Sequence, residues 1–227
     1  TGTGFFINEL GYLISNHHVI GDCKLVQARY KGRIYDVEVS SFDAVNDLAV
    51  GQIKQKNTEY IKLARDISLA EDILVFGFPL TDKLGFSIKA TKGIVSSLSG
   101  PSNNSAIIQF DASIQKGNSG GPIVNDKSEL LGVTVATNSI TDILEETGTI
   151  PQNINYGIKV QTLKSFLDAN EIKYKISNKA QKLENKVIAK EVSNATMLVG
   201  CLNTKEVKNK YIKSRKHTGF ISKSDKF

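Results

Sequence analysis

The sequence predicts an all-β protein, built as a barrel or a sandwich. Short apolar stretches recur along residues 1–160, and turn-forming pairs such as Gly100-Pro101 and Asn125-Asp126 separate them. No helical pattern alternates with these stretches, which argues against a parallel α/β sheet. Hydrophobic residues make up 40% of the 227 residues and charged residues 23%. That balance is typical of a globular domain rather than of a disordered or fibrous chain.

The strands are predicted in order along the chain. Residues 5–7 and 12–14 flank the turn 8–11 and indicate a hairpin. Regularly spaced short strands of this kind favour a closed or two-layered β architecture. The further strands are expected at residues 33–39, 48–53, 73–78, 93–95, 106–110, 120–124 and 130–135.

Helical patterns begin only after this strand-rich part. Residues 161–170 place their apolar side chains on one face of a helix. A second helix is expected over about residues 179–191, followed by a short β-like run at residues 195–199. From Lys205 onwards the chain is rich in lysine and weakly patterned.

Charge divides the chain into two parts. Residues 1–170 hold 15 Lys and Arg against 18 Asp and Glu, a net charge of −3, whereas residues 171–227 hold 14 against 5, a net charge of +9. We therefore expect a main domain over residues 1–172 and a Lys-rich C-terminal appendage over residues 173–227, with a disordered end. Such charge attracts nucleic acid or anionic membranes. The appendage has few aromatic residues and no nucleic-acid motif, so no nucleic-acid partner is expected.

The sequence gives no indication of a membrane-spanning helix, a disulfide framework or a metal site. No apolar run reaches the roughly 18 residues that a membrane-spanning helix needs, so no transmembrane segment is predicted. Two cysteines, Cys23 and Cys201, are too few for a disulfide framework. Neither a CxxC pair nor a Cys/His cluster indicates a zinc site, and we expect no metal and no cofactor. No signal peptide is visible, and a chain that begins at Thr1 leaves targeting open.

The segment from Asp111 to Pro122 carries the clearest chemical signal. Ser119 stands among glycines, which let the backbone approach a substrate carbonyl closely. The amides of Gly117 and Ser119, with Asn118 between them, could turn the same way and form an oxyanion hole. A plain glycine-rich turn is the alternative interpretation of these residues.

The same residues match G-x-S-x-G, the nucleophile elbow of α/β-hydrolases. That motif needs a helix after the serine and, further along, an acidic residue followed by a histidine. Here residues 122–124 predict a strand, and the one downstream histidine is His217 in the Lys-rich tail. We therefore reject the elbow.

A histidine pair, His17 and His18, ends an apolar strand. One histidine in such a place is most often a hydrogen-bonded core residue, and a pair could also suggest a metal. Adjacent side chains rarely point at one ion, and no third ligand is evident, so a metal site is not expected.

Asp47 leads directly into an apolar strand, where a carboxylate is costly to bury unless it is paired. A histidine Nδ1–H is a suitable partner for it. Asp43 is the rival carboxylate, and we interpret it as a solvated turn residue. The order His18, Asp47, Ser119 is then that of a chymotrypsin-type catalytic triad on a chain predicted to be all-β.

Three segments together resemble the HtrA/Deg type of trypsin-like serine protease: residues 1–20, 47–50 and 117–122. Residues 155–160, with the helix that follows, are similar to the end of that protease domain, so the resemblance covers about residues 1–170. It implies a chymotrypsin-like double six-stranded β-barrel, with the catalytic triad in the cleft between the barrels and a C-terminal helix.

The resemblance also assigns roles within the motifs. His18 is the catalytic histidine by the family pattern, Asn16 is part of the motif, and His17 occupies a variable position. Ser119 would attack a peptide carbonyl while His18 takes its proton, Asp47 would hold the imidazole, and the amides from Gly117 to Ser119 would bind the oxyanion. The acyl-enzyme is then hydrolysed by water.

The function implied is that of a serine endopeptidase that acts on unfolded or extended polypeptides in protein quality control. A catalytically silent pseudo-protease, which holds peptides at a barrel edge like a chaperone, is the alternative. All three triad positions are filled, and nothing in the sequence favours that alternative. The family's usual setting implies an exported, periplasmic or cell-envelope location in a bacterium, and the oligomeric state is left open.

Substrate preference is predicted from the residue six positions before the nucleophile, which lies near the base of the primary pocket in trypsin-like proteases. Here that residue is Ser113. Because it is a serine rather than an acid, cleavage after Lys or Arg is not expected. The resemblance favours small or medium aliphatic side chains. The residues expected to line the pocket and the substrate-binding edge are Ser113, Ile114, Thr134, Val135, Ala136 and Thr137.

The chain departs from the family pattern at both ends. Residues 171–227 are too few and too basic for the PDZ domain that usually follows, and the first barrel strand should precede Thr1. We hypothesise that residues 195–199 dock on the N-terminal barrel in place of that strand. Cys201 would then come near Cys23, either as a disulfide or as two buried free thiols.

Overall fold

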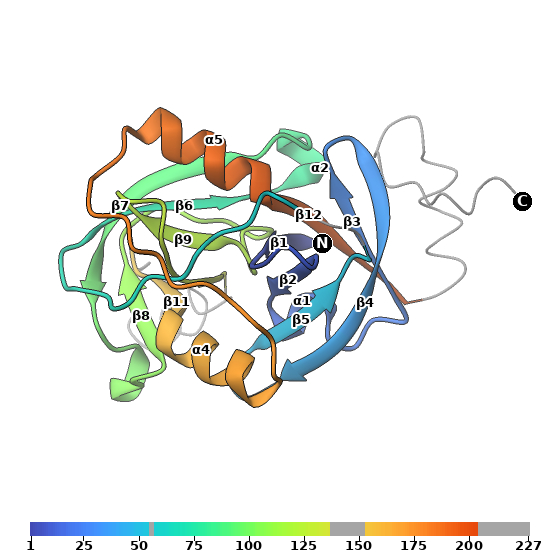
Figure 1. The fold of residues 1–227 in the computed structure, drawn as a ribbon, viewed down its shortest axis with the longest axis horizontal. Coiled ribbons are helices and arrows are strands. Elements are labelled where there is room, and N and C mark those ends of the chain that lie inside the picture. Colours follow the sequence, from blue (N-terminus) through green and yellow to red (C-terminus); the bar gives the residue numbers. More distant parts are fainter. Residues whose placement is uncertain (55–56, 137–152, 204–227) are drawn as a thin grey trace, which may run out of the picture.

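Twelve strands close into two six-stranded antiparallel barrels in the computed structural model, which describes residues 1–54, 57–136 and 153–203 (Figure 1). This arrangement confirms the predicted chymotrypsin-like class. In barrel order, the first barrel consists of β1 (Gly2–Phe6), β12 (Thr196–Leu202), β3 (Leu25–Tyr30), β4 (Arg33–Asp43), β5 (Leu48–Gln52) and β2 (Tyr12–Ser15). The second consists of β10 (Leu130–Val135), β11 (Asn155–Lys159), β8 (Ile107–Phe110), β7 (Lys89–Ser97), β6 (Asp72–Gly77) and β9 (Pro122–Asn125).

One apolar core joins the two barrels. Buried side chains from the first barrel, such as Phe5, pack in the same cluster as Phe76 and Val133 of the second barrel. Helix residues Leu163 and Ile188 complete this cluster from outside the barrels. A fully buried side chain of this size contributes about 1.5–3 kcal/mol, so the shared core holds the barrels in a fixed relation. Each barrel also has an interior cluster of its own.

Strand β12 closes the first barrel from the C-terminal part of the chain. Its residues pair with β1 on one side, with Gly2 opposite Val199, and with β3 on the other, with Arg29 opposite Leu198. These pairings confirm the hypothesis that this run docks on the N-terminal barrel. Residues 173–203, which the charge pattern placed in an appendage, therefore include a strand of that barrel.

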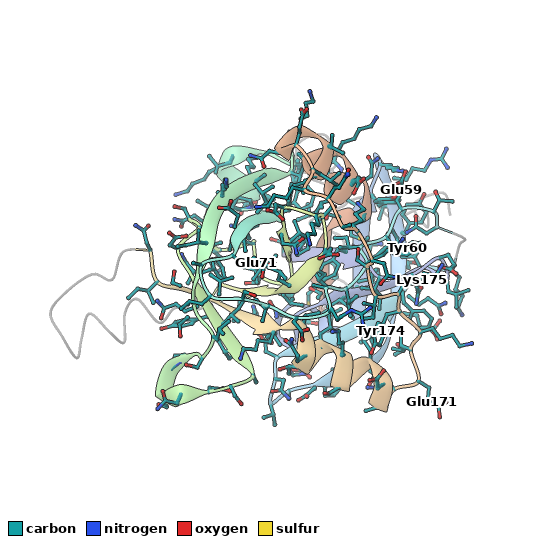
Figure 2. All side chains as sticks on the ribbon, turned by 60° about the vertical axis from the view of Figure 1, so that its left-hand side comes forward. Glu59, Tyr60, Glu71, Glu171, Tyr174 and Lys175 are labelled. Carbon is teal, nitrogen blue, oxygen red and sulfur yellow. A yellow bond between two sulfur atoms is a disulfide. The ribbon has the colours of Figure 1, made fainter. Side chains whose placement is uncertain are left out.

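An extended segment carries the chain back from the second barrel to the first. The amide of Leu63 donates to the carbonyl of Lys175 at 2.9 Å, and the amide of Ser177 donates to the carbonyl of Leu63 at 2.8 Å. The Lys175 ammonium also donates to the Tyr60 hydroxyl at 3.0 Å, and Figure 2 labels both residues on this side of the molecule. These hydrogen bonds anchor the extended segment before α5 begins.

The helices are α1 (His17–Ile20), α2 (Thr81–Leu84), α4 (Val160–Ala169) and α5 (Asn185–Ala195), with a short 3₁₀ turn, η1, at Pro101–Asn103. The helix predicted at residues 161–170 is α4. The helix predicted over about residues 179–191 corresponds to α5, but its predicted start is wrong. Residues 179–184 belong to the extended segment that precedes α5. There the amide of Leu183 donates to the carbonyl of Asp126 at 2.7 Å. Within the described residues, no helix is long and apolar enough to cross a membrane.

Cys23 and Cys201 form a disulfide in the structure, with their Cα atoms 5.4 Å apart. Cys201 lies on β12, and Cys23 lies between α1 and β3. The link therefore ties the closing strand to the segment that follows the α1 histidines. The two cysteines are separated by 178 positions in the sequence.

Candidate active site

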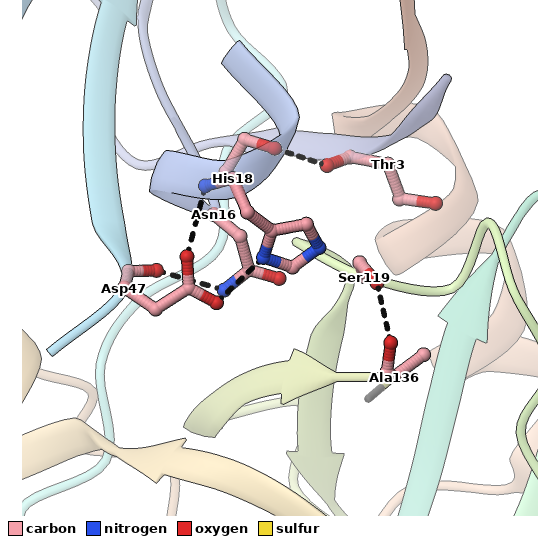
Figure 3. Close-up of polar contacts among 7 residues, drawn as sticks. Thr3, Asn16, His18, Asp47, Ser119 and Ala136 are labelled. Atoms are coloured by element: carbon pink, nitrogen blue, oxygen red, sulfur yellow. Dashed lines mark hydrogen bonds and ion pairs between the residues drawn. The ribbon is translucent and has the colours of Figure 1, made fainter. Parts of the chain in front are cut away.

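Three distant segments bring a histidine, a carboxylate and a serine to the junction of the two barrels (Figure 3). His18 lies on α1 and Asp47 lies in the turn between β4 and β5, both on the first barrel. Ser119 lies in the loop between β8 and β9 of the second barrel. These are the three residues that the sequence pattern predicted for one site.

Asp47 directs both of its carboxylate oxygens at His18. Its Oδ2 lies 2.7 Å from His18 Nδ1, and its Oδ1 accepts a hydrogen bond from the His18 amide at 2.9 Å. The backbone of Asp47 has a φ of 53°, a left-handed conformation that Asp tolerates better than most residues. Its carbonyl accepts hydrogen bonds from the Asn16 side chain at 2.9 Å and from the His17 amide at 3.2 Å. Residues 16–18 therefore bind both the backbone carbonyl and the side chain of Asp47, which keeps the carboxylate directed at His18.

This contact sets the orientation of the His18 ring. With Asp47 accepting from Nδ1–H, the neutral imidazole has its lone pair on Nε2, which is the atom that can accept a proton. Figure 3 shows this nitrogen on the side of the ring toward Ser119. The His18 side chain is 47% exposed, so its contact with Asp47 contributes little to stability and chiefly orients the ring.

The Ser119 hydroxyl points away from the histidine in this structure. Its Oγ donates to the carbonyl of Ala136 at 3.4 Å (Figure 3). Within the described residues, no hydrogen bond joins Ser119 to His18. Catalytic hydrogen bonds are often long or unformed before substrate binds, and a rotation about the serine χ1 bond changes the partner of the hydroxyl.

Glycines shape the nucleophile loop, which we define as residues 116–121. Gly117 has a φ of 104°, and a Cβ there would lie 2.5 Å from the carbonyl oxygen of Phe78. Gly120 has a φ of 81°, and a Cβ there would collide with the carbonyl oxygen of Thr3. Both positions combine a left-handed backbone with close contact, so only glycine fits.

Thr3 on β1 holds this loop from the first barrel, and the sequence analysis did not single it out. Its amide donates to the carbonyl of Ser119 at 2.8 Å, and its Oγ1 donates to the carbonyl of Gly117 at 2.8 Å. The same Oγ1 accepts from the amide of Phe78 at 3.1 Å. Thr3 is fully buried, and its carbonyl accepts from the Ser15 hydroxyl at 2.7 Å. The available signal was a small polar residue between two glycines at a strand start.

Two amides of the nucleophile loop have no hydrogen-bond acceptor among the residues that the structure describes. The Asn118 amide donates to the carbonyl of Gln115 at 2.9 Å, and the Gly120 amide donates to the carbonyl of Thr134 at 2.9 Å. Across the described residues, the amides of Gly117 and Ser119 donate no hydrogen bond. An oxyanion hole requires unused donors beside the nucleophile, and these two amides meet that one requirement.

Comparison with known proteins places this chain in a family. The sequence pattern of the trypsin-like peptidase domain matches residues 2–133. The chain belongs to the trypsin-like peptidase family. Within it, the chain is of the HtrA/Deg type. It is 31% identical over 175 residues to "Serine endoprotease DegS" of Escherichia coli, an alignment that covers 74% of this chain and 47% of that protein.

Two further proteins are similar to this chain. The solved serine endoprotease of Yersinia pestis superposes with a TM-score of 0.61 at 31% identity, covering 74% of this chain and 56% of that one. The "Uncharacterized protein y4bJ" of Sinorhizobium fredii is 33% identical over 201 residues, which cover 88% of this chain and 32% of that protein. This trypsin-like chain thus spans between about a third and a half of the length of these curated relatives.

The residues expected to form the substrate pocket of this trypsin-like domain occupy different environments. Ser113 is exposed, and Ile114 is half-buried against the interior of the second barrel. Thr134 is fully buried, and its amide donates to the carbonyl of Gly121 at 2.8 Å, so its main chain aligns the nucleophile loop. Val135 and Ala136 are half-buried beside it, and Thr137 lies outside the described residues.

Asp43, the rival carboxylate, is engaged within its own turn. Its Oδ1 accepts from the amides of Val45 at 2.9 Å and Asn46 at 3.0 Å, and its Oδ2 accepts from the Asn46 side chain at 2.6 Å. Partial burial works to raise the pKa of Asp43, but these hydrogen bonds outweigh it and lower the pKa below its ordinary value.

The His17 ring packs against Phe42 with the ring centres 4.6 Å apart. Among the described residues, no group of three or more His, Cys, Asp or Glu side chains could hold a metal ion.

Proposed function

We propose that this chain is an active serine endopeptidase with Ser119 as nucleophile, His18 as general base and Asp47 as the residue that orients His18. The observation that carries the proposal is the double contact of the Asp47 carboxylate with His18, on the barrel that faces the Ser119 loop. A structural histidine needs one partner, whereas here both its amide and its Nδ1 are fixed by a single carboxylate.

The reaction proceeds in two halves. The Ser119 hydroxyl turns from Ala136 to His18, and its oxygen attacks the substrate carbonyl while Nε2 of His18 takes the proton. The amides of Gly117 and Ser119 donate to the oxygen that becomes negatively charged. His18 then gives its proton to the leaving amine, and water hydrolyses the acyl-enzyme by the same proton transfers in reverse order. Asp47 stabilises the imidazolium that forms in each half.

The substrates in this proposal are extended polypeptides, cleaved after small or medium aliphatic side chains. Residue 113 is a serine, so it offers no carboxylate that could pair with the side chain of a substrate Lys or Arg, and this supports the aliphatic preference. A role in protein quality control and an exported location are proposed from the relatives. One relative, from Chlamydia muridarum, is named "Probable periplasmic serine endoprotease DegP-like" and is 32% identical over 142 residues.

Labelling with a fluorophosphonate probe tests the proposal, because the probe reacts with an activated serine and needs no known substrate. We expect covalent labelling of the wild type at Ser119 and none in S119A. Asp47→Asn is expected to slow labelling by about 10³–10⁴-fold, since the ring would lose its correct tautomer. Asp43→Asn is the matched control and is expected to label at nearly the wild-type rate.

One observation favours the alternative of a silent, peptide-holding protein: the hydrogen bond of the Ser119 hydroxyl to Ala136. In that case folded wild type would not label, while an extended peptide would still bind to S119A and wild type equally. Labelling of wild type together with loss in D47N would contradict the alternative. Equal labelling of wild type and D47N would contradict the proposed triad.

A further inference from the structure

A cavity distinct from the Ser119 site lies between the tip of the β3–β4 hairpin, the segment around α2 and the end of α5. Its volume is about 270 Å³. The hairpin tip is the two-residue turn Lys31-Gly32, whose positive φ values of 47° and 76° fit the tight turn that joins paired Tyr30 and Arg33. We call this space the Arg29 cavity.

The floor and walls of the Arg29 cavity are largely apolar. Phe78 and Leu198 are buried and form one apolar cluster, against which Ile34, Phe86 and Ile88 pack. Leu198 and Ile34 are the cross-strand partners of Arg29 on either side of β3. The strand neighbours of the arginine on both sides are therefore apolar, while Ser193, Asn194 and Thr196 also line the cavity.

Arg29 itself has a buried donor without an acceptor. Its guanidinium stacks on the Phe86 ring, 4.9 Å from the ring centre, and its Nη1 is buried without a hydrogen-bond partner in the described structure. An arginine remains charged in proteins, so it cannot relieve this situation by losing a proton. A buried charged donor without an acceptor is unfavourable, and an anion that enters the cavity would satisfy it.

The charge of the cavity lining has one sign. Arg29 and Lys31 both line it, and none of the lining residues that the structure describes is acidic. Lys31 Nζ lies 4.0 Å from the Glu59 carboxylate, so Arg29 is the cation that faces the cavity without a counter-charge. A larger cavity of about 760 Å³ elsewhere has a mixed lining, with charges that largely compensate one another: Glu9, Asp168 and Glu171 against Lys173 and Lys175. Low-dielectric walls around a single sign of charge favour an oppositely charged ligand.

We propose that the Arg29 cavity binds a small organic carboxylate with an apolar tail, with the carboxylate on Arg29 and the tail against Phe78 and Leu198. The volume lies slightly below the range of about 300–1,000 Å³ typical of ligand pockets, which selects a ligand smaller than a drug-sized molecule. Such a carboxylate is found in a free short-chain acid or at the C-terminus of a peptide.

The cavity shares a wall with the nucleophile loop. Phe78 lines the cavity, its amide donates to Thr3 Oγ1 at 3.1 Å, and its carbonyl lies against Gly117. A ligand packed on Phe78 therefore contacts the residue that supports the loop through Thr3. Binding is expected to change the reactivity of Ser119, and this regulatory part rests on the proposed function.

Binding is tested on the full chain by ligand-observed NMR with three probes: hexanoate, N-acetyl-leucine and N-acetyl-leucinamide. We expect hexanoate or N-acetyl-leucine to bind and the uncharged amide not to bind. Arg29→Met keeps the apolar stack on Phe86 and is expected to weaken binding by about 10- to 100-fold, the value of a charge-assisted hydrogen bond. Arg33→Met is the matched control, because it removes the same charge from the exposed far side of the turn.

A second variant guards against misfolding of R29M. Ser193→Asp places a carboxylate on the cavity lining, where it would occupy Arg29 and repel the ligand, and it is expected to abolish binding. Binding of hexanoate alone would assign the free acid, and binding of N-acetyl-leucine alone would assign a peptide C-terminus. Equal binding of the amide, unchanged binding in R29M and S193D, or no binding of either acid would overturn the proposal.

The regulatory part has its own readout. Saturating acid is expected to change the rate of fluorophosphonate labelling in wild type and to leave it unchanged in R29M. An unchanged rate in wild type, with binding demonstrated, would refute the coupling. If wild type does not label at all, the binding experiment still decides whether the site exists, because it does not depend on Ser119.

Discussion

Replacing Thr3 by valine removes a single hydroxyl from beneath the nucleophile loop while keeping the shape of the side chain. The hydroxyl donates to the carbonyl of Gly117 and accepts from the amide of Phe78, and both bonds are buried. Neither backbone group has water to turn to, so the substitution leaves one acceptor and one donor unsatisfied. At about 1–3 kcal/mol for each of the two groups, we expect the free energy of unfolding to fall by about 2–6 kcal/mol.

The same change should be visible in the site. Once the carbonyl of Gly117 is released, the peptide unit between Gly117 and Asn118 can rotate, and the backbone on either side of it shifts, including the Gly117 and Ser119 amides that we propose to bind the oxyanion. A misplacement of about 1 Å at reacting atoms costs on the order of 10²-fold in rate. We therefore expect fluorophosphonate labelling of folded Thr3→Val to be about 10- to 100-fold slower than that of wild type.

Urea unfolding and labelling kinetics measure the two effects separately. Thr3→Ser is the matched control, because it keeps the hydroxyl and removes only a buried methyl group, at a cost of about 1 kcal/mol. The labelling rate is compared at a urea concentration where both variants are folded. If T3V unfolds within about 0.5 kcal/mol of wild type and labels at the same rate, Thr3 does not support the loop.

The remaining predictions concern the disulfide and one surface turn. Mass spectrometry of the non-reduced protein should show a linked Cys23–Cys201 peptide pair that gains two hydrogens on reduction, and Cys201→Ser should lower the free energy of unfolding by about 3–5 kcal/mol because the bond closes a very long loop. Alkylation of both thiols in native, oxidised protein would contradict this. The lowered pKa of Asp43 means that its ionised form contributes stability above its ordinary pKa of 3.8 and loses it as the pH falls toward the lower folded value. Asp43→Asn should therefore be less stable than wild type at neutral pH and equal to it in strong acid, and a constant difference across that range would argue against the turn hydrogen bonds.

Local patterns were sufficient for elements that carry their own apolar signal. The strand at residues 73–78 corresponds to β6, and the helix at 161–170 corresponds to α4, because each presents one continuous face to a core. Strand β3, at Leu25–Tyr30, was not predicted, although its inward side chains are buried. Its sequence mixes Gln27 and Arg29 with apolar residues, and β12 supplies the partner that decides its structure.

The same division applies to the candidate site. The segments around His18, Asp47 and Ser119 could be identified because each motif is short and contiguous. The contact of Thr3 with Gly117 spans 114 positions, and no local pattern marks it. The rotamer of Ser119, which points to Ala136, is likewise set by neighbours in space.

By itself, the sequence determined which residue types were available and in what order: short strands, a histidine, a carboxylate and a serine in a glycine-rich loop. The sequence suggested that residues 195–199 dock on the first barrel and bring Cys201 near Cys23. Only the tertiary structure decided that β12 pairs with both β1 and β3, that the two cysteines form a disulfide, and that the described lining of the cavity beside Arg29 holds no acidic residue. The physical reason is that strand propensity and turn chemistry act over a few residues, whereas barrel closure pairs strands from opposite ends of the chain. Barrel closure also decides which polar groups are hydrogen-bonded within the protein and which are left for a substrate or ligand.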